Sequence, residues 1–254
     1  MSAVPDSLKL EGARFVGRSL RGARFIDSDL SHVRARGVML DGADFDSPWL
    51  LDGEGSLVVN GVDVAPLVEV ELNRRFPGRA QRRAEDAEGL RGAWGAVEAS
   101  WRQATDRASA FPDGAVDVSV EGEWSFSQTL RHLVFATDAW LSRGIQGAEE
   151  PFHPLGQPRA GAEDDGVDLA FFASTPPPYE QVLAVRSERL AQVREFLASV
   201  DDAGLDEERR HPWSPEYPET VRSCLHVILE EEWEHLRYAL RDLDALDDAA
   251  AQGR

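Results

Sequence analysis

The first fifty residues repeat a large apolar side chain at every fifth position, and this period constrains the fold more than any other feature. Leucine or phenylalanine fills seven of the eight in-phase positions and alanine fills the other: Leu10, Phe15, Leu20, Phe25, Leu30, Ala35, Leu40 and Phe45. A helix repeats about every 3.6 residues and a strand about every two, so neither fits a period of five. Small residues precede several of the large ones by two positions, as in GARF and GADF. The segment therefore predicts a repeat architecture.

This stretch, the pentapeptide ladder (residues 8–47), resembles the pentapeptide-repeat family. The resemblance implies a short right-handed quadrilateral β-helix in which the large and the small residue of each repeat point inward. With four repeats per coil, the ladder would form about two coils, which bury little and leave open ends. We therefore expect the ladder to pack against another element for stability. A β-hairpin is predicted next, because Asn60-Gly61 separates two apolar alternations in SLVVNGVDV.

The charge balance argues against nucleic acids and membranes as partners. The chain has 27 basic and 46 acidic residues and a net charge of −19, which repels phosphate backbones and anionic bilayers. Residues 1–48 carry seven of each sign and are neutral, so the ladder is not expected to mimic DNA. We expect a structural appendage, with protein docking or self-association through the ladder as its other role.

Other whole-chain features indicate a reducing, cytoplasmic setting. No run of about 18 apolar residues predicts a transmembrane helix. The first residues lack the apolar segment of a secretory signal. The one cysteine, Cys224, allows no intrachain disulfide.

Four amphipathic helices are predicted after a polar stretch, GRAQRRAEDAEG. They cover about residues 84–108, 125–142, 179–199 and 220–246, and the second starts at a capping box formed by Ser125 and Gln128. A long Pro-, Gly- and Asp-rich connection, residues 144–178, suggests a lid or pocket wall. We predict a mainly α four-helix bundle with a long crossover at 84–254. The ladder and hairpin (1–62) and a short helix and linker (63–83) precede it.

The last helix carries the most informative pattern, CLHVILEEEWEHLRYALRDL. Glu231 and His235 are four residues apart and share one helix face, about 6 Å apart along the axis. Ionisable groups turned toward a bundle core need a strong partner, and a divalent cation would supply it. His132, among apolar residues of the second helix, is the candidate third ligand. Three such ligands leave open positions, as in catalytic zinc sites. The alternative to a metal site is that each histidine is a core residue with a hydrogen-bond partner in the protein, and that the run of glutamates is a solvent-exposed face of the helix.

Two motifs about a hundred residues apart, EWSFSQTLRHLVFATDAWL and EEEWEHLRYALRDL, resemble the DinB/YfiT-like superfamily of metal-binding four-helix proteins. The resemblance covers residues 84–254. This group includes the mycothiol-dependent maleylpyruvate isomerase and related thiol S-transferases. The resemblance implies metal ligands at His132, Glu231 and His235, and the glutamate variant is that of the isomerase. It also implies zinc as the cation and mycothiol as the low-molecular-weight thiol co-substrate.

We therefore expect a metal-dependent thiol S-transferase or isomerase that acts on a small electrophile. His153, in the long connection, and Tyr238, on the same stripe as Glu231, are candidates for substrate contacts. The alternatives are a metal-dependent hydrolase that uses the same site, and a non-enzymatic binding or scaffold protein that docks through the ladder while the metal braces the bundle.

Three further residues could be mistaken for site residues. His226 precedes His235 by nine positions, which places it on the opposite side of the helix. Cys224 shares the stripe of Glu231 and is either a nucleophile or a buried, inert thiol. Trp124, like the other tryptophans, is expected in the core or in an interface.

Overall fold

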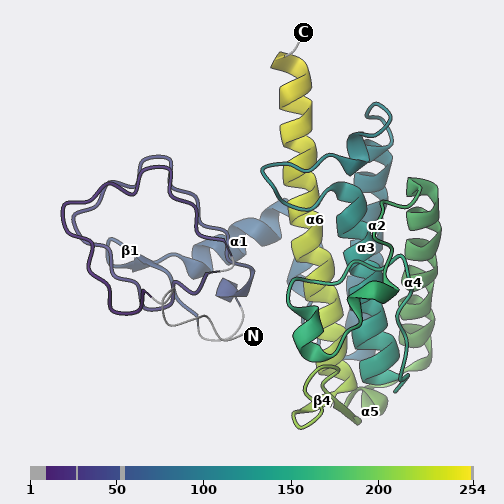
Figure 1. Ribbon diagram of the computed structural model, residues 1–254. Helices are drawn as coiled ribbons and strands as arrows, with labels where there is room; N and C mark the ends of the chain where they lie inside the picture. The colour runs from purple at the N-terminus through teal and green to yellow at the C-terminus, as the bar shows by residue number, and fades with distance from the viewer. Residues whose placement is uncertain (1–9, 27, 52–54, 253–254) are drawn as a thin grey trace.

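A bundle of four long helices forms the centre of the computed structural model, which describes residues 10–26, 28–51 and 55–252 (Figure 1). The helices are α2 (Ala87–Ala108), α3 (Phe126–Thr137), α4 (Tyr179–Ser199) and α6 (Val221–Gln252). Helices α2 and α3 each pack against both α4 and α6. The predicted mainly helical bundle is confirmed. None of the helices described is long and apolar enough to cross a bilayer.

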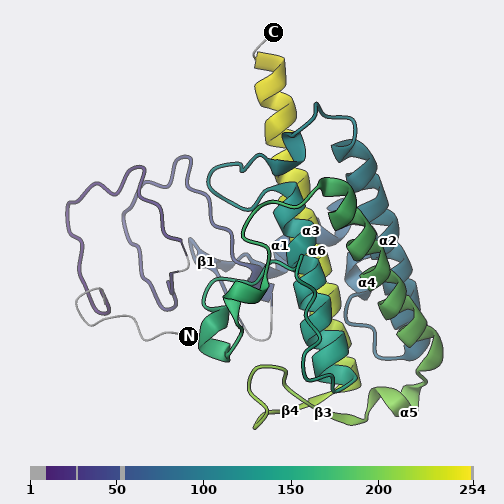
Figure 2. The same ribbon diagram turned by 45° about the vertical axis from the view of Figure 1, so that its right-hand side comes forward.

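The long crossover makes α3 and α4 run in the same direction, because it returns the chain along the bundle before α4 begins (Figures 1 and 2). Helix α4 leads into α5 (Asp202–Leu205) at the end of the bundle where α6 starts. Two antiparallel strands, β3 (Glu208–Arg210) and β4 (Pro218–Thr220), complete this connection. Helices α2 and α6 therefore run opposite to α3 and α4.

Helix α3 begins at the predicted capping box and ends differently from the prediction. The hydroxyl of Ser125 accepts a hydrogen bond from the Gln128 amide, and the Gln128 side chain accepts one from the Ser125 amide. The helix was predicted to continue to residue 142, but it changes at Asp138 into a π-helix, η5 (Asp138–Ile145). Leu141 and Ile145 in this segment are both buried. Such π segments occur frequently at functional sites.

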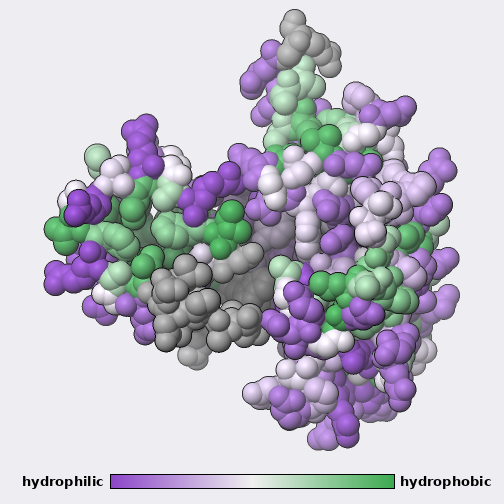
Figure 3. Space-filling model, in the orientation of Figure 1, coloured by the Kyte–Doolittle hydropathy of each residue, from purple (hydrophilic) through white to green (hydrophobic). Residues whose placement is uncertain are grey.

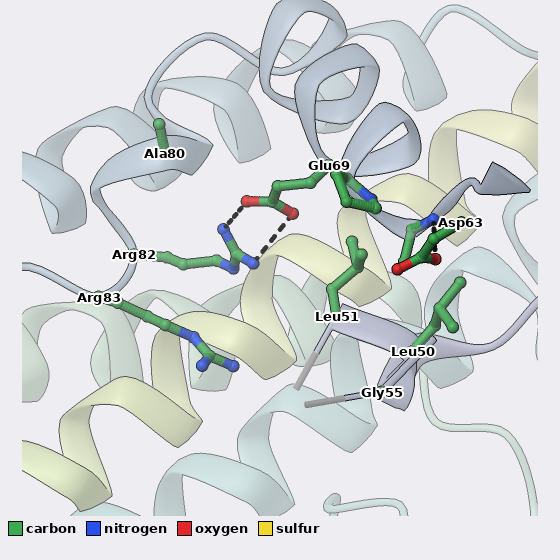
Figure 4. Close-up of a pocket in the computed structure, with 10 residues that line it drawn as sticks. Leu50, Leu51, Gly55, Asp63, Glu69, Ala80, Arg82 and Arg83 are labelled. Atoms are coloured by element: carbon green, nitrogen blue, oxygen red, sulfur yellow. Dashed lines mark hydrogen bonds and ion pairs between the residues drawn. The ribbon is translucent and has the colours of Figure 1, made fainter. Parts of the chain in front are cut away.

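Buried arginines bind two short elements to α6. These elements are the helix α1 (Ala65–Arg75) and the 3-10 turn η3 (Arg79–Gln81). Arg79 donates to Glu69 at 2.9 Å and to Glu234 at 3.4 Å. Arg82 donates to Glu69 at 2.9 and 3.3 Å and to Glu230 at 2.9 Å. Figure 4 shows Glu69 reaching from α1 to Arg82 beside a surface pocket. Glu69 thus joins α1 to two arginines that also bind α6.

Replacing Glu69 by glutamine is expected to destabilise the protein in a pH-dependent way. Burial raises the pKa of Glu69, but Arg82 and Arg79 lower it further, to about 2, from an ordinary value of 4.5. The folded-state pKa is depressed, so the contribution to stability is complete above about pH 5 and is lost as the pH falls toward 2. Urea denaturation should show the largest difference between the wild type and E69Q near neutral pH. A difference that stays constant on acidification would contradict this account.

The ladder makes regular turns, but its described residues form no β-strand. The amides of Ala13, Ala23, Val33 and Ala43 each donate to the carbonyl three residues earlier. The large side chains of the ladder remain 39% (Leu30) to 67% (Leu10) exposed, and Figure 3 shows apolar residues on its surface. The quadrilateral β-helix with inward large residues is therefore not confirmed. Two coils share a single coil-to-coil face, which leaves little surface on which these side chains could be buried.

The hairpin predicted at Asn60-Gly61 is present after the ladder. It pairs β1 (Val58–Val59) with β2 (Val62–Asp63) in antiparallel register. Asn60 has φ 51° and Gly61 has φ 84°, so both turn residues lie in the left-handed region. A two-residue hairpin loop of type I′ needs this conformation, which asparagine and glycine adopt most readily.

Candidate metal centre

Helices α3 and α6 bring together the three residues predicted as metal ligands. Glu231 Oε2 lies 3.4 Å from His132 Nε2 and 3.3 Å from His235 Nδ1. One donor atom from each of the three residues lies within 4.8 Å of the others. Within the described part of the chain, no fourth His, Cys, Asp or Glu joins this group. The arrangement fits a cation held by three protein groups.

Both imidazoles use one nitrogen to bind a main-chain carbonyl. His132 Nδ1 donates to the carbonyl of Gln157 at 3.0 Å, and His235 Nδ1 donates to that of Glu231 at 2.9 Å. A carbonyl only accepts, so in each neutral ring Nδ1 carries the proton and Nε2 carries the lone pair. His132 therefore points a lone pair at a carboxylate oxygen. This contact needs a proton or a cation between the two atoms.

The protonation states of the site also suit a cation. Burial raises the pKa of Glu231, but the adjacent imidazoles of His132 and His235, when they carry a proton, lower it more, to about 2. Burial, together with His132, lowers the pKa of His235 to about 4. At neutral pH the site thus presents an ionised carboxylate and an uncharged imidazole, the forms in which these groups bind metals.

Aromatic rings border the two imidazoles. The ring of Trp124, which precedes the N-cap of α3, lies 4.6 Å from the His132 ring and 6.1 Å from the His235 ring, measured between centroids. Tyr238 meets His235 edge-on at 5.9 Å. The side chain of Glu231 is 28% exposed, so solvent reaches the candidate metal centre. Trp124 was expected in the core or in an interface, and its contact with both histidines was not foreseen.

The crossover covers α3 and supplies the carbonyl of Gln157. The buried carboxylate of Asp138 anchors it by accepting from the His153 amide at 2.9 Å and from Arg189 Nε at 2.6 Å. An aromatic cluster then packs between the crossover and α3: Phe135, Phe152, Phe172 and Trp213. A Cβ added at Gly156 would lie 3.1 Å from the carbonyl oxygen of His153, so glycine suits the tight turn of the crossover beside this cluster. The long connection therefore forms a wall beside His132.

The other candidate residues lie outside the three-residue cluster. Tyr238 contacts His235, whereas His153 lies in the crossover and its Nδ1 accepts from the Leu155 amide at 3.1 Å. His226 binds the carbonyl of Ala84 at 2.9 Å and does not join the cluster, as the helical spacing predicted.

Cys224 has the surroundings of an inert thiol. Its side chain is fully buried. Burial and the charge of Glu219 raise the pKa of the thiol to about 12. The group is therefore protonated at neutral pH and out of reach of solvent.

Comparison with known families supports both parts of the chain. A family model described as the DinB superfamily matches residues 96–239, a range that includes His132, Glu231 and His235. A model of pentapeptide repeats matches eight copies over residues 9–46. Searches of curated proteins and of solved structures found no significant match.

Proposed function

Because the chain belongs to the DinB superfamily and gathers two histidines and a glutamate at one point, we propose that it is a metal-dependent thiol S-transferase or isomerase. Its substrate would be a small electrophile, with mycothiol or a similar low-molecular-weight thiol as the co-substrate. Zinc suits the two imidazole nitrogens and one carboxylate, because catalytic zinc sites use three such ligands and keep further positions open.

One observation carries this proposal. His132 turns the Nε2 lone pair toward the Glu231 carboxylate while its Nδ1 is engaged by the carbonyl of Gln157. His235 Nδ1 binds the carbonyl of Glu231, so this ring is also held by a main-chain oxygen. A hydrogen-bonded second nitrogen is the usual arrangement for a metal-bound histidine, because it fixes the tautomer and the ring orientation. A divalent cation held by His132, Glu231 and His235 would lower the pKa of a coordinated thiol toward neutrality.

The chain's own residues would provide the surroundings of the reaction. Trp124 covers one side of both imidazoles and limits the access of water. The crossover, held by Asp138 and Arg131, would present the surface that selects the electrophile. His153 and Tyr238 stay candidates for substrate contacts. The only cysteine is buried and protonated, so a nucleophilic thiol would have to come from a second substrate.

The expected result is product formation that requires both metal and thiol. Protein purified without a metal-affinity tag is first checked for bound metal by elemental analysis. The zinc-loaded protein is then incubated with mycothiol and electrophiles of three kinds: an activated alkene, an alkyl halide and an epoxide. Mass spectrometry should detect the thioether, and the proton NMR spectrum of the product should detect the isomerised alkene, which has the same mass as its substrate. Equal turnover without thiol would instead indicate a hydrolase, and a protein that takes up no stoichiometric metal would contradict the proposal.

A further inference from the structure

The ladder contacts the bundle near the candidate metal centre. Its last charged residue, Asp46, accepts two hydrogen bonds from the guanidinium of Arg237 on α6, both at 2.8 Å. The Tyr238 hydroxyl donates to the same carboxylate at 3.3 Å. In both views the ladder lies beside α6, on the side away from α4 (Figures 1 and 2). Asp46 thus binds two consecutive side chains that follow the cluster residue His235.

Tyr238 connects this contact to the imidazole of His235. Arg237 Cζ lies 4.4 Å from the centroid of the Tyr238 ring, so the guanidinium that binds Asp46 also packs on this ring. The ring meets His235 edge-on, with the centroids 5.9 Å apart. Tyr238 is therefore held at its hydroxyl by Asp46 and along its ring by Arg237. A displacement of Asp46 would move the ring that packs against His235.

A second contact reaches the other histidine. Arg24, in an earlier repeat of the ladder, donates from Nη2 to the carbonyl of Glu121 at 3.0 Å. Glu121 lies in the connection from α2 to α3, three residues before Trp124, and has φ 53°. The ring of Trp124 lies against the imidazole of His132, as described above. The ladder therefore contacts the segment of Tyr238, whose ring packs on His235, and the segment that leads to Trp124, whose ring packs on His132.

We propose that the pentapeptide ladder is a structural part of the metal centre, and that Asp46 and Arg24 are positioning residues. Asp46 would orient Tyr238 against His235, and Arg24 would hold the Glu121 segment that places Trp124 on His132. The ladder then joins α6 to the segment that leads into α3, and α3 and α6 are the two helices that must keep a fixed separation for the three donor atoms to converge. The part of this inference that concerns metal affinity rests on the proposed function.

The test compares two pairs of matched variants of the full-length protein. D46N removes the ion pair with Arg237, and D44N removes an equal charge two residues away that forms no hydrogen bond or ion pair with any residue the structure describes. R24Q removes the bond to Glu121, and R21Q is its control. The first readout is the NMR signals of the histidine rings in metal-free protein. D46N should displace the signals of His235, and R24Q those of His132, while both controls leave them in place.

The second readout is the affinity for Co²⁺ and the visible spectrum of the Co²⁺-loaded protein. Removal of a group that bonds directly to a metal ligand weakens metal binding by about 10- to 100-fold. Asp46 acts one contact further out, through Tyr238, so D46N should raise the Kd by at most about tenfold and shift the bands. Ring signals of His235 and His132 unchanged in D46N and R24Q would overturn the inference. A displacement equally large at His211, at the far end of the bundle, would also overturn it. A wild type that binds no Co²⁺ would refute the proposed function. The histidine-ring NMR signals of the metal-free protein would then still show whether the ladder positions His235 and His132.

Discussion

Substitution of Glu231 by glutamine is expected to lower the affinity for Zn²⁺ by more than about 100-fold, because a ligand contributes more than the outer-sphere partners whose loss costs 10- to 100-fold. The amide keeps the shape of the carboxylate but removes its charge. The two imidazoles would then be the only remaining protein ligands of the cluster. The side chain is 28% exposed, so the amide can be solvated and the bundle should stay folded.

Competition with a chromophoric chelator would measure the affinity of E231Q, and thermal unfolding would report its fold. The control is E230Q, which removes the neighbouring carboxylate that accepts from Arg82 on the outer side of α6. E230Q should bind zinc like the wild type. Equal zinc affinity in E231Q and the wild type would remove Glu231 from the site. A metal that merely braces the bundle would instead make E231Q unstable, with no thiol-dependent turnover in the wild type.

Substitution of Arg186 by methionine is expected to cost about 3–5 kcal/mol of stability, because it leaves a buried carboxylate without its partner. Arg186 on α4 donates to Glu232 on α6, and their side chains are 4% and 1% exposed. Burial raises the pKa of Glu232, and Arg186 with the nearby Trp101 offsets this only in part. At about 2–4 °C per kcal/mol for a domain of this size, the melting temperature should fall by about 10 °C.

The double variant R186M/E232L tests whether the loss comes from the unpaired charge. Replacing a whole buried ion pair by apolar side chains is often neutral or stabilising, so the double variant should recover most of the stability. R194M is the control on the same helix, because Arg194 is 58% exposed and its pair with Glu98 is worth at most about 1 kcal/mol. If R186M and R194M were equally stable, the buried pair would not matter for the fold.

The helical part of the fold could be predicted because local signals agree with the tertiary packing. The apolar spacing of Leu90, Trp94, Val97 and Trp101 marks the buried face of α2, and all four side chains are buried. The capping box at Ser125 set the start of α3. Similarly, the four-residue spacing of Glu231 and His235 was enough to place both on one face. The apolar surroundings of His132 in the second predicted helix made it the candidate third ligand, and the family resemblance implied the same residue.

The missing details depend on contacts between segments that are distant in sequence. The π-helix after Thr137 stands where the apolar spacing predicts a regular α-helix, because that spacing does not mark a change to wider turns. Trp124 reaches both histidines only because α3 and α6 are neighbours. The ion pair between Asp46 and Arg237 joins residues 191 positions apart, and no local pattern marks it. The short hairpin of β3 and β4 also lacks a turn motif such as Asn-Gly.

The hydrogen bond from His132 to Gln157 uses a main-chain oxygen. We therefore expect the site to tolerate substitutions at position 157 but not deletions in the crossover. Every amino acid offers the same carbonyl, so position 157 can vary in chemistry while the imidazole keeps its tautomer. Loss of one residue from the crossover would withdraw the acceptor altogether. Over evolutionary time the side chains of the crossover could therefore diversify without disturbing the orientation of His132, provided that the crossover keeps its length.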